Sequence, residues 1–328
     1  MKATSQESVL RRHRGAEEHQ SPAGFGATSW KATLRRTKER IKADRVTMAA
    51  GSLAYHWFLA FFPAVIAALG LLTLVSVAPG TLHHLTHGIG KALPAGSAGV
   101  FTAAVKAATR RAAGSLLALV IGIVVALWSA SSGMAVLEQA LDIAYEVPTD
   151  RSFLSRRLLG VLLMAVVAVV GGVAGALVIF GQPIGSALEG YLPLHGVVFS
   201  VVWTVVRWVL ALGLLTSLFS AIYYLAPNRE SPRWRWVSPG GLLATAVFLV
   251  ASLGFSFYVS SFGSYSKTYG SFAGVAILIF WLWLVGLAVL IGGEMNAETE
   301  REAAELEEGS RQPVTVAGVT TEEQREAV

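Results

Sequence analysis

The sequence has no cysteine among its 328 residues, and only 14% of its residues are charged. Without cysteine the chain forms no disulfide and no zinc or iron–sulfur site that needs a cysteine ligand. Soluble domains carry about 25% charged residues on average, so this low charge argues against an ordinary soluble protein. The pattern Gly-x-x-x-x-Gly-Lys-Ser/Thr is also absent, so ATP hydrolysis is not expected. The sequence predicts no cofactor.

What the chain has in abundance is apolar sequence. Hydrophobic residues make up 54% of it, and the mean hydropathy is +0.57. Several uncharged runs are each long enough, at about 1.5 Å per helical residue, to cross about 30 Å of hydrocarbon. They predict an all-α, polytopic membrane protein with a six-helix bundle over residues 48–297. The predicted spans are 48–77, 113–137, 158–181, 197–226, 240–262 and 271–295.

Charged residues gather in the two tails. Residues 1–47 hold eleven Lys or Arg and five acids, and they include an expected amphipathic helix at about 29–45. Residues 298–328 form an acidic tail that is expected to be disordered. Counted over the loops and both tails, Lys and Arg favour one side of the membrane by twenty to five, which predicts that both termini are cytoplasmic. A basic tail beside a membrane is typical of an orientation signal, so no nucleic-acid partner is expected.

Three residues inside the spans are candidates for a transport pathway. Arg207 lies deep in the fourth span, where a charge is costly unless it faces the bundle or a wet cavity. It would contact an anionic headgroup, or it would reach the interface with Trp203 and Trp208 stacked on its guanidinium group. His56 would be a buried hydrogen-bonded residue or a proton relay. Pro63 removes a helical hydrogen bond and predicts a kink.

Carboxylates at the ends of the spans are the second group of candidates. Glu138, Asp142, Glu146 and Asp150 recur every four residues after the second span. They would form ion pairs with Arg151, Arg156 and Arg157 across the turn at Pro148, or less plausibly a metal cluster for catalysis. Glu294 ends the sixth span, where it would pair with an arginine or close a cavity. No metal site is expected, although His83, His84 and His87 form a His-His-x-x-His pattern.

Aromatic and small residues predict contacts with lipid and between helices. Trp30 lies on the apolar face of the expected amphipathic helix. A run of alternating cations and indoles is typical of an anchor at the level of the lipid headgroups, and it consists of Arg233, Trp234, Arg235 and Trp236. Gly171 and Gly175 form a Gly-x-x-x-Gly pattern that favours close packing between helices.

An ordered set of short motifs resembles the YihY/BrkB family of envelope membrane proteins, formerly labelled ribonuclease BN. The motifs span about residues 44–297, and the departures are His56 and Asp142, the latter where the family commonly has asparagine. The matching segments are Ala49–Tyr55 with Phe62–Pro63, Leu127–Gly133, Leu137–Leu141, Tyr224–Asn228, Pro239–Gly240, Tyr265, Tyr269–Gly270 and Gly292–Ala297. The resemblance implies a multi-pass protein of a bacterial cytoplasmic membrane that supports envelope integrity.

The leading functional hypothesis is transport or flipping of an anionic lipid or lipid-linked molecule, with membrane lipids as partners. The alternative is a structural or scaffold membrane protein whose tails bind other proteins. A ribonuclease is the least favoured, because no acid–base or metal set converges in the sequence, and the protein is expected not to be an enzyme. The sequence does not indicate the oligomeric state.

Overall fold

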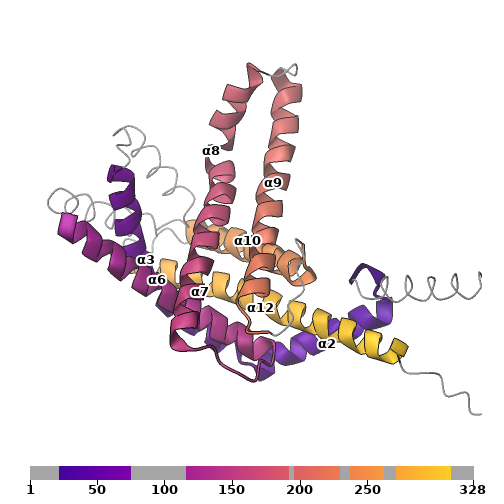
Figure 1. The fold of residues 1–328 in the computed structure, drawn as a ribbon. Coiled ribbons are helices and arrows are strands. Elements are labelled where there is room, and N and C mark those ends of the chain that lie inside the picture. The colour runs from indigo at the N-terminus through magenta and orange to yellow at the C-terminus, as the bar shows by residue number, and fades with distance from the viewer. Residues whose placement is uncertain (1–21, 75–115, 192–195, 230–236, 262–270, 312–328) are drawn as a thin grey trace, which may run out of the picture. The chain divides into compact units, whose positions relative to one another are not determined.

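A computed structural model describes residues 22–74, 116–191, 196–229, 237–261 and 271–311. The chain divides into two units, one of residues 1–36 with 298–328 and one of residues 37–297. The described part is helical, without a strand. Its elements, drawn in Figure 1, are η1 (Pro22–Gly24), α2 (Ala27–Ala43), α3 (Val46–Leu74), α6 (Leu116–Ala144), α7 (Phe153–Val166), the π-helical turn η2 (Val167–Gly171), α8 (Gly172–Glu189), α9 (Gly196–Leu225), α10 (Pro239–Ser261) and α12 (Ser271–Arg311).

Four helical stretches of the described chain are long and apolar enough to cross a membrane. They are Phe153–Glu189, Gly196–Leu225, Pro239–Ser261 and Ala273–Glu308, and they match the last four predicted spans. The prediction of an all-helical protein with membrane-crossing helices is therefore confirmed for these segments. Helices α3 and α6 occupy the first two predicted spans. The count of six and the cytoplasmic termini stay predictions.

The end of the chain corrects one prediction. The tail from residue 298 was expected to be disordered, but α12 continues as a helix to Arg311. The physical reason is the spacing of its acids: Glu298, Glu302 and Glu305 recur on one helical face. Within this unit, Arg36 of α2 pairs with all three, at 3.5 Å from Glu298 and 2.8 Å from Glu305. The glutamates that were expected to be solvated on a disordered tail instead form one ion-paired cluster with Arg36.

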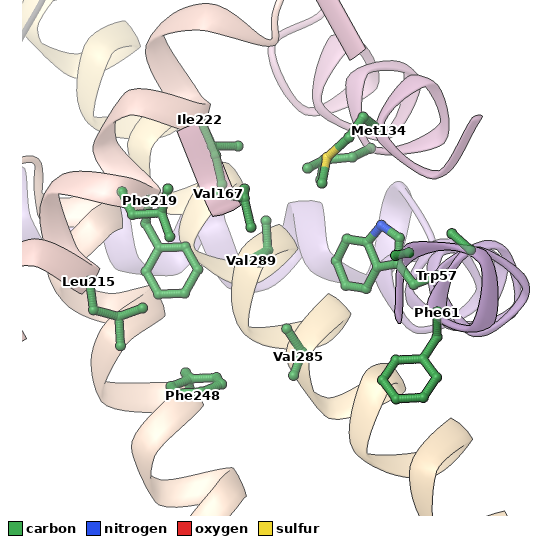
Figure 2. Close-up of a pocket in the computed structure, with 14 residues that line it drawn as sticks. Trp57, Phe61, Met134, Val167, Leu215, Phe219, Ile222, Phe248, Val285 and Val289 are labelled. Atoms are coloured by element: carbon green, nitrogen blue, oxygen red, sulfur yellow. The ribbon is translucent and has the colours of Figure 1, made fainter. Parts of the chain in front are cut away.

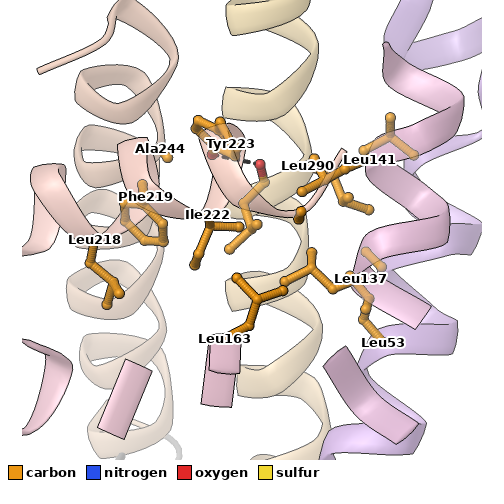
Figure 3. Close-up of a cluster of buried hydrophobic side chains, with 14 residues drawn as sticks. Leu53, Leu137, Leu141, Leu163, Leu218, Phe219, Ile222, Tyr223, Ala244 and Leu290 are labelled. Atoms are coloured by element: carbon orange, nitrogen blue, oxygen red, sulfur yellow. Dashed lines mark hydrogen bonds between the residues drawn. The ribbon is translucent and has the colours of Figure 1, made fainter. Parts of the chain in front are cut away.

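The unit of residues 37–297 has a core drawn from six helices and the segment after α9. Figure 3 shows that side chains of α3, α6, α7, α9, α10 and α12 meet there. The buried set is Val46, Ala50, Leu53, Leu137, Leu141, Leu163, Leu218, Phe219, Ile222, Tyr223, Ala226, Ala244, Val289 and Leu290. The Tyr223 hydroxyl donates to the Val289 carbonyl at 2.7 Å, so the one polar atom of this tyrosine is satisfied inside the core.

Small residues let the helices of this unit approach closely. A Cβ added at Gly292 of α12 would lie 2.6 Å from the Gly240 carbonyl oxygen of α10. A Cβ at Gly160 of α7 would lie 2.8 Å from the Ser131 carbonyl oxygen of α6. Helices in lipid gain little from hydrophobic burial against each other, so their association depends on such close van der Waals packing.

Candidate functional site: an ionic cluster beside an apolar cavity

The cluster begins where α6 ends. Glu146 has a positive φ of 51°, and its amide donates to the Ile143 carbonyl at 3.0 Å, while the Val147 amide donates to the Asp142 carbonyl at 2.9 Å. This pair of bonds is a Schellman ending, formed here without the usual glycine. The chain then turns through Pro148 into α7, whose N-cap Ser152 accepts from the Ser155 amide at 3.4 Å. The turn sets Arg151 against the last turns of α6.

Arg151 joins α6 to the segment that follows α9. Its Nη1 lies 3.0 Å from Oε1 of Glu138, a side chain with no exposed surface, and 2.7 Å from the Ala226 carbonyl oxygen. Its Nη2 reaches the carbonyl of Pro227 at 3.2 Å, and its Nε donates to Asn228 Oδ1 at 3.1 Å. One guanidinium group therefore binds one oxygen of a buried carboxylate and several carbonyl groups that no longer have helical donors, while Glu138 Oε2 has no hydrogen-bond partner among the described residues. The predicted ion pairing of Glu138 is confirmed.

Asp142 is buried one turn further along α6 and binds the backbone instead of an arginine. Its Oδ1 accepts from the Asn228 amide at 2.8 Å, and the Asn228 side chain donates to the Thr149 carbonyl at 3.0 Å. Glu138 and Asp142 both lie beyond the predicted apolar span. Burial raises the pKa of each carboxyl group above its ordinary value, against the lowering effect of the Arg151 pair on Glu138 and of the Asn228 amide on Asp142.

The other two acids of the predicted series are separate from this cluster. Glu146 pairs with Arg40 of α2, and Asp150 lies 3.4 Å from Arg156 with most of its side chain exposed. The four carboxylates therefore have four different environments. Because their partners differ, the cluster can clamp chain segments together, and its two buried acids are already engaged by Arg151 and by Asn228.

Beside the ionic cluster lies an apolar cavity of about 330 Å³ (Figure 2). This volume is at the lower end of the range of about 300–1,000 Å³ for small-molecule sites. Its wall has no charged residue. The lining residues are Trp57, Ala60, Phe61, Ala64, Met134, Leu137, Val167, Leu215, Leu218, Phe219, Ile222, Phe248, Val285 and Val289. Such a cavity suits a hydrocarbon group and excludes a hydrated ion.

Cavity and cluster are adjacent along two helices. Leu137 lines the cavity and is followed directly by Glu138, while Ile222 lines it one turn before the Ala226 carbonyl that Arg151 binds. The two features are therefore neighbours along α6 and α9, although no charged residue of the cluster lines the cavity.

Arg207 of α9 does not line this cavity. Its aliphatic and guanidinium atoms lie over Gly181 of α8, with Nη1 2.8 Å from the place of a Gly181 Cβ. Trp203 lies over Gly185 and donates to the Gly181 carbonyl at 2.5 Å. The expected stacking of Trp203 on Arg207 is not present; Trp203 stacks on Phe199, with ring centroids 6.5 Å apart. Arg207 is partly buried, and its role in a pathway stays a prediction.

The remaining candidates flank the cavity or close the core. His56 was expected to be buried, but it is only partly buried, and its Nδ1 donates to the Ser52 carbonyl of its own helix at 2.8 Å. Pro63 lies within α3 between the lining residues Phe61 and Ala64. Glu294 is 2% exposed on α12. Their functional roles stay predictions.

The expected lipid anchors are only partly within the described residues. Trp30 of α2 contacts Phe25 with ring centroids 5.5 Å apart. The run Arg233, Trp234, Arg235 and Trp236 lies outside the described residues, as do His83, His84 and His87. The structure gives no account of them.

Two functional residues were not singled out from the sequence. Arg151 was only one of three possible partners of the acids, and Asn228 was only part of a motif. The signal for Asn228 was its place after Pro227, where the chain leaves a helix and carbonyl groups need donors. Nothing in the spacing distinguished Arg151 from its neighbours.

Comparisons with known proteins agree with this architecture. Residues 37–315 match the protein family described as Virulence factor BrkB. The ribonuclease-like protein YfkH of Bacillus subtilis is 35% identical over 248 residues, which cover 76% of this chain and 88% of that protein. The UPF0761 membrane protein PBPRA3489 of Photobacterium profundum is 29% identical over 87% of this chain and 85% of its own length.

A further relative is longer than this chain. The UPF0761 membrane protein Mpe_A1422 of Methylibium petroleiphilum is 27% identical over 82% of this chain, and the match spans 62% of that protein. No solved structure matches the chain.

Proposed function

The chain belongs to the family of the virulence factor BrkB, whose relatives include membrane proteins, and on that premise we propose that it transports or flips an anionic lipid or lipid-linked molecule. In this proposal the molecule crosses a bacterial cytoplasmic membrane, and its transfer supports envelope integrity. The observation that carries this proposal is the apolar cavity next to the buried ionic cluster. The acyl chain of a lipid fits such an apolar cavity, whereas Arg151 is already bound to Glu138 and to backbone carbonyl groups, so the headgroup needs a cation outside the cluster.

The position of the cavity among the helices supports lipid handling. Residues from α3, α6, η2, α9, α10 and α12 all contribute to its wall, so a change in helix packing changes its volume. Val167 lies in the π-helical turn, an irregularity that is frequent at functional sites. Pro63 removes a helical hydrogen bond of α3 between the lining residues Phe61 and Ala64. The wall therefore includes two elements with weakened helical bonding.

Flux measurements in liposomes test the proposal. The full chain is reconstituted with a fluorescent anionic phospholipid, and the fraction bleached by an impermeant quencher is recorded. The protein is expected to bleach more than the outer-leaflet share. Val285→Phe fills the cavity from α12 and is expected to reduce flux to that of protein-free vesicles. Val250→Phe makes the same change on an exposed position of α10 and is expected to leave flux unchanged.

The outcomes separate lipid transfer from other roles. Equal flux in Val285→Phe and the unchanged chain, with both proteins folded, would remove the cavity from the mechanism. Flux equal to protein-free vesicles in every sample would exclude unassisted flipping of that lipid. Arg207→Ala, measured beside them at normal protein abundance, tests whether this residue lies on the pathway.

A scaffold role is the second candidate, and the cluster of Arg36 with three glutamates supports it. These ion pairs order the end of α12, which gives partner proteins a folded surface at the tails. Pull-down with residues 1–47 and 298–328 present or deleted tests this role.

A ribonuclease is the least supported function. Although one relative is named ribonuclease-like, the buried acids Glu138 and Asp142 are engaged by Arg151 and Asn228. We therefore propose a non-enzymatic role. RNA cleavage by the detergent-purified protein that disappears in a Glu138→Ala, Asp142→Ala variant would overturn it.

A further inference from the structure

A second arginine of the α6–α7 corner has a different environment from Arg151. The Nη1 of Arg157 donates to Ser131 Oγ at 3.0 Å, to Ser132 Oγ at 2.6 Å and to the Trp128 carbonyl at 3.3 Å. Both serine hydroxyls also donate to that carbonyl at 2.9 Å. Three groups of α6 therefore hold one nitrogen of this side chain in place.

Two aromatic rings hold the plane of the same guanidinium group. Its central carbon lies 4.3 Å from the ring centroid of Trp128 and 5.4 Å from that of Phe153. The two rings are 6.5 Å apart by their centroids. Cation–π contacts of this kind fix the orientation of an arginine while leaving its charge uncompensated. No carboxylate pairs with Arg157 among the described residues.

The rest of the guanidinium group is available to a ligand. The Nε and Nη2 atoms of Arg157 make no hydrogen bond within the described chain, and the side chain is only partly buried. These two nitrogens form the edge that binds two oxygens of a phosphate or carboxylate group at once. The arginine is held by Nη1 and by its faces, so this edge is preorganised.

The surroundings indicate that the ligand comes from the membrane. Trp128 and Phe153 are 58% and 68% exposed, and the neighbouring Leu154 and Leu158 are 67% and 64% exposed. Arg157 lies four residues after the start of the apolar run Phe153–Glu189, about 6 Å along the helix. An arginine beside a tryptophan at this depth is at the level of the lipid headgroups.

We propose that Arg157, with Ser131, Ser132, Trp128 and Phe153, forms a binding site for the phosphate of an anionic phospholipid. This proposal rests on the proposed lipid-handling function and extends it. It assigns the binding of the headgroup to Arg157 on the exposed side of the α6–α7 corner. The site is separate from the apolar cavity, since none of these five residues lines that cavity.

Native mass spectrometry of the full chain in detergent tests the site. Phosphatidylglycerol and phosphatidylcholine with identical acyl chains are titrated onto the protein, and their apparent affinities are compared. The unchanged chain is expected to prefer phosphatidylglycerol. Arg157→Gln is expected to reduce that preference about fivefold, the equivalent of about 1 kcal/mol for one arginine at an anionic surface. Arg156→Gln removes the adjacent arginine, whose partner is Asp150, and is expected to keep the preference.

A folded Arg157→Gln variant that keeps the full preference would overturn the site. Competition by glycerol phosphate at the same concentration as the lipid would assign the site to a soluble phosphate and overturn the lipid assignment. Should Arg157→Gln not fold, a phosphatidylglycerol probe with a photoreactive headgroup decides the question on the unchanged chain. Crosslinks within residues 128–132 and 153–158 support the site, and crosslinks confined to other segments overturn it.

This binding measurement is independent of lipid flux. Headgroup binding at Arg157 without flux would contradict the proposed transport but not the site. Flux with no preference at Arg157 would leave transport standing and refute the site.

Discussion

Arg151 is the residue on which the end of the bundle depends. It contacts Glu138 of α6 and the carbonyl groups after α9, and its side chain is only 17% exposed. Its replacement leaves a carboxylate buried without its cation. Arg151→Gln is therefore expected to reduce the free energy of unfolding by about 3 kcal/mol. Thermal unfolding in detergent, followed by tryptophan fluorescence, measures this change.

Arg156→Gln is the matched control for that experiment. The Arg156 side chain is itself 16% exposed, but its partner Asp150 is 81% exposed, so the replacement leaves no buried carboxylate without a cation and the expected loss is below about 1 kcal/mol. Equal losses in the two variants would show that Arg151 is not the central contact of this corner.

The two buried acids predict a dependence of stability on pH. Burial raises the pKa of Glu138 and of Asp142 in the folded protein. Between their ordinary and their raised pKa values, the folded state binds more protons than the unfolded state. The contribution of these two groups to stability therefore falls as the pH rises through that window, and it is fully present below their ordinary pKa values. Unfolding in detergent at a series of pH values measures the slope. A Glu138→Gln, Asp142→Asn variant that keeps the full slope would contradict this assignment.

At the level of single residues, the sequence predicted types of contact better than partners. Glu138 was expected to pair with one of three arginines, and it pairs with Arg151. Arg157 was grouped with the same acids, but it binds the serines and the ring of Trp128. The choice depends on the direction in which the chain leaves the turn at Pro148, and this direction follows from the Schellman ending at Glu146. Spacing along one helix contains no such information.

At the level of elements, close helix contacts explain why some glycines cannot be replaced. Gly292 of α12 lies against Gly240 of α10, with a backbone oxygen 2.6 Å from the place of its Cβ. Gly292→Ala is expected to destabilise the protein by about 1–3 kcal/mol, because the backbones must separate. A Cβ added at Gly175 of α8 has no atom within 4 Å. Gly175→Ala is therefore expected to stabilise the folded protein by about 0.5–1 kcal/mol, because alanine favours the helix. Chemical or thermal unfolding of both variants checks the opposite signs, and the same sign in both would refute the packing argument.

The existence of the helices was easier to predict than their contacts. Apolar runs of about 25 residues predict helices in lipid, because the backbone must satisfy its own hydrogen bonds there. The pattern Gly171-x-x-x-Gly175 suggested the contact between α8 and its neighbour, yet Gly175 faces open space. The close approach to α9 occurs at Gly181 and Gly185, under Arg207 and Trp203. Both pairs have the same spacing, so only the rotation of the helix about its axis distinguishes them.

At the scale of the whole molecule, the acidic tail was misjudged because its charges were counted apart from those of the basic tail, where the expected helix at about 29–45 is present as α2. Residues 1–47 are basic and residues 298–328 are acidic, and each composition alone is typical of a solvated segment. Arg36 joins them through Glu298, Glu302 and Glu305. Complementary charge between segments about 260 residues apart is visible in the sequence, but the pairing requires the helical face that α12 gives these glutamates.

Membrane topology is the property of the whole chain that most needs a direct test, and the absence of cysteine makes it accessible. The excess of Lys and Arg predicts cytoplasmic termini, so the helical run Phe153–Glu189 should cross outward. At about 1.5 Å per residue its 37 residues are about 55 Å long, enough to place Ser155 and Gly190 on opposite sides. Both residues are exposed.

An impermeant maleimide is expected to label Gly190→Cys in intact cells and Ser155→Cys only after permeabilisation. Labelling of both from one side would show that this run does not cross the membrane. The reverse accessibility would invert the orientation and place the Arg151 and Arg157 corner, with its headgroup site, in the outer leaflet.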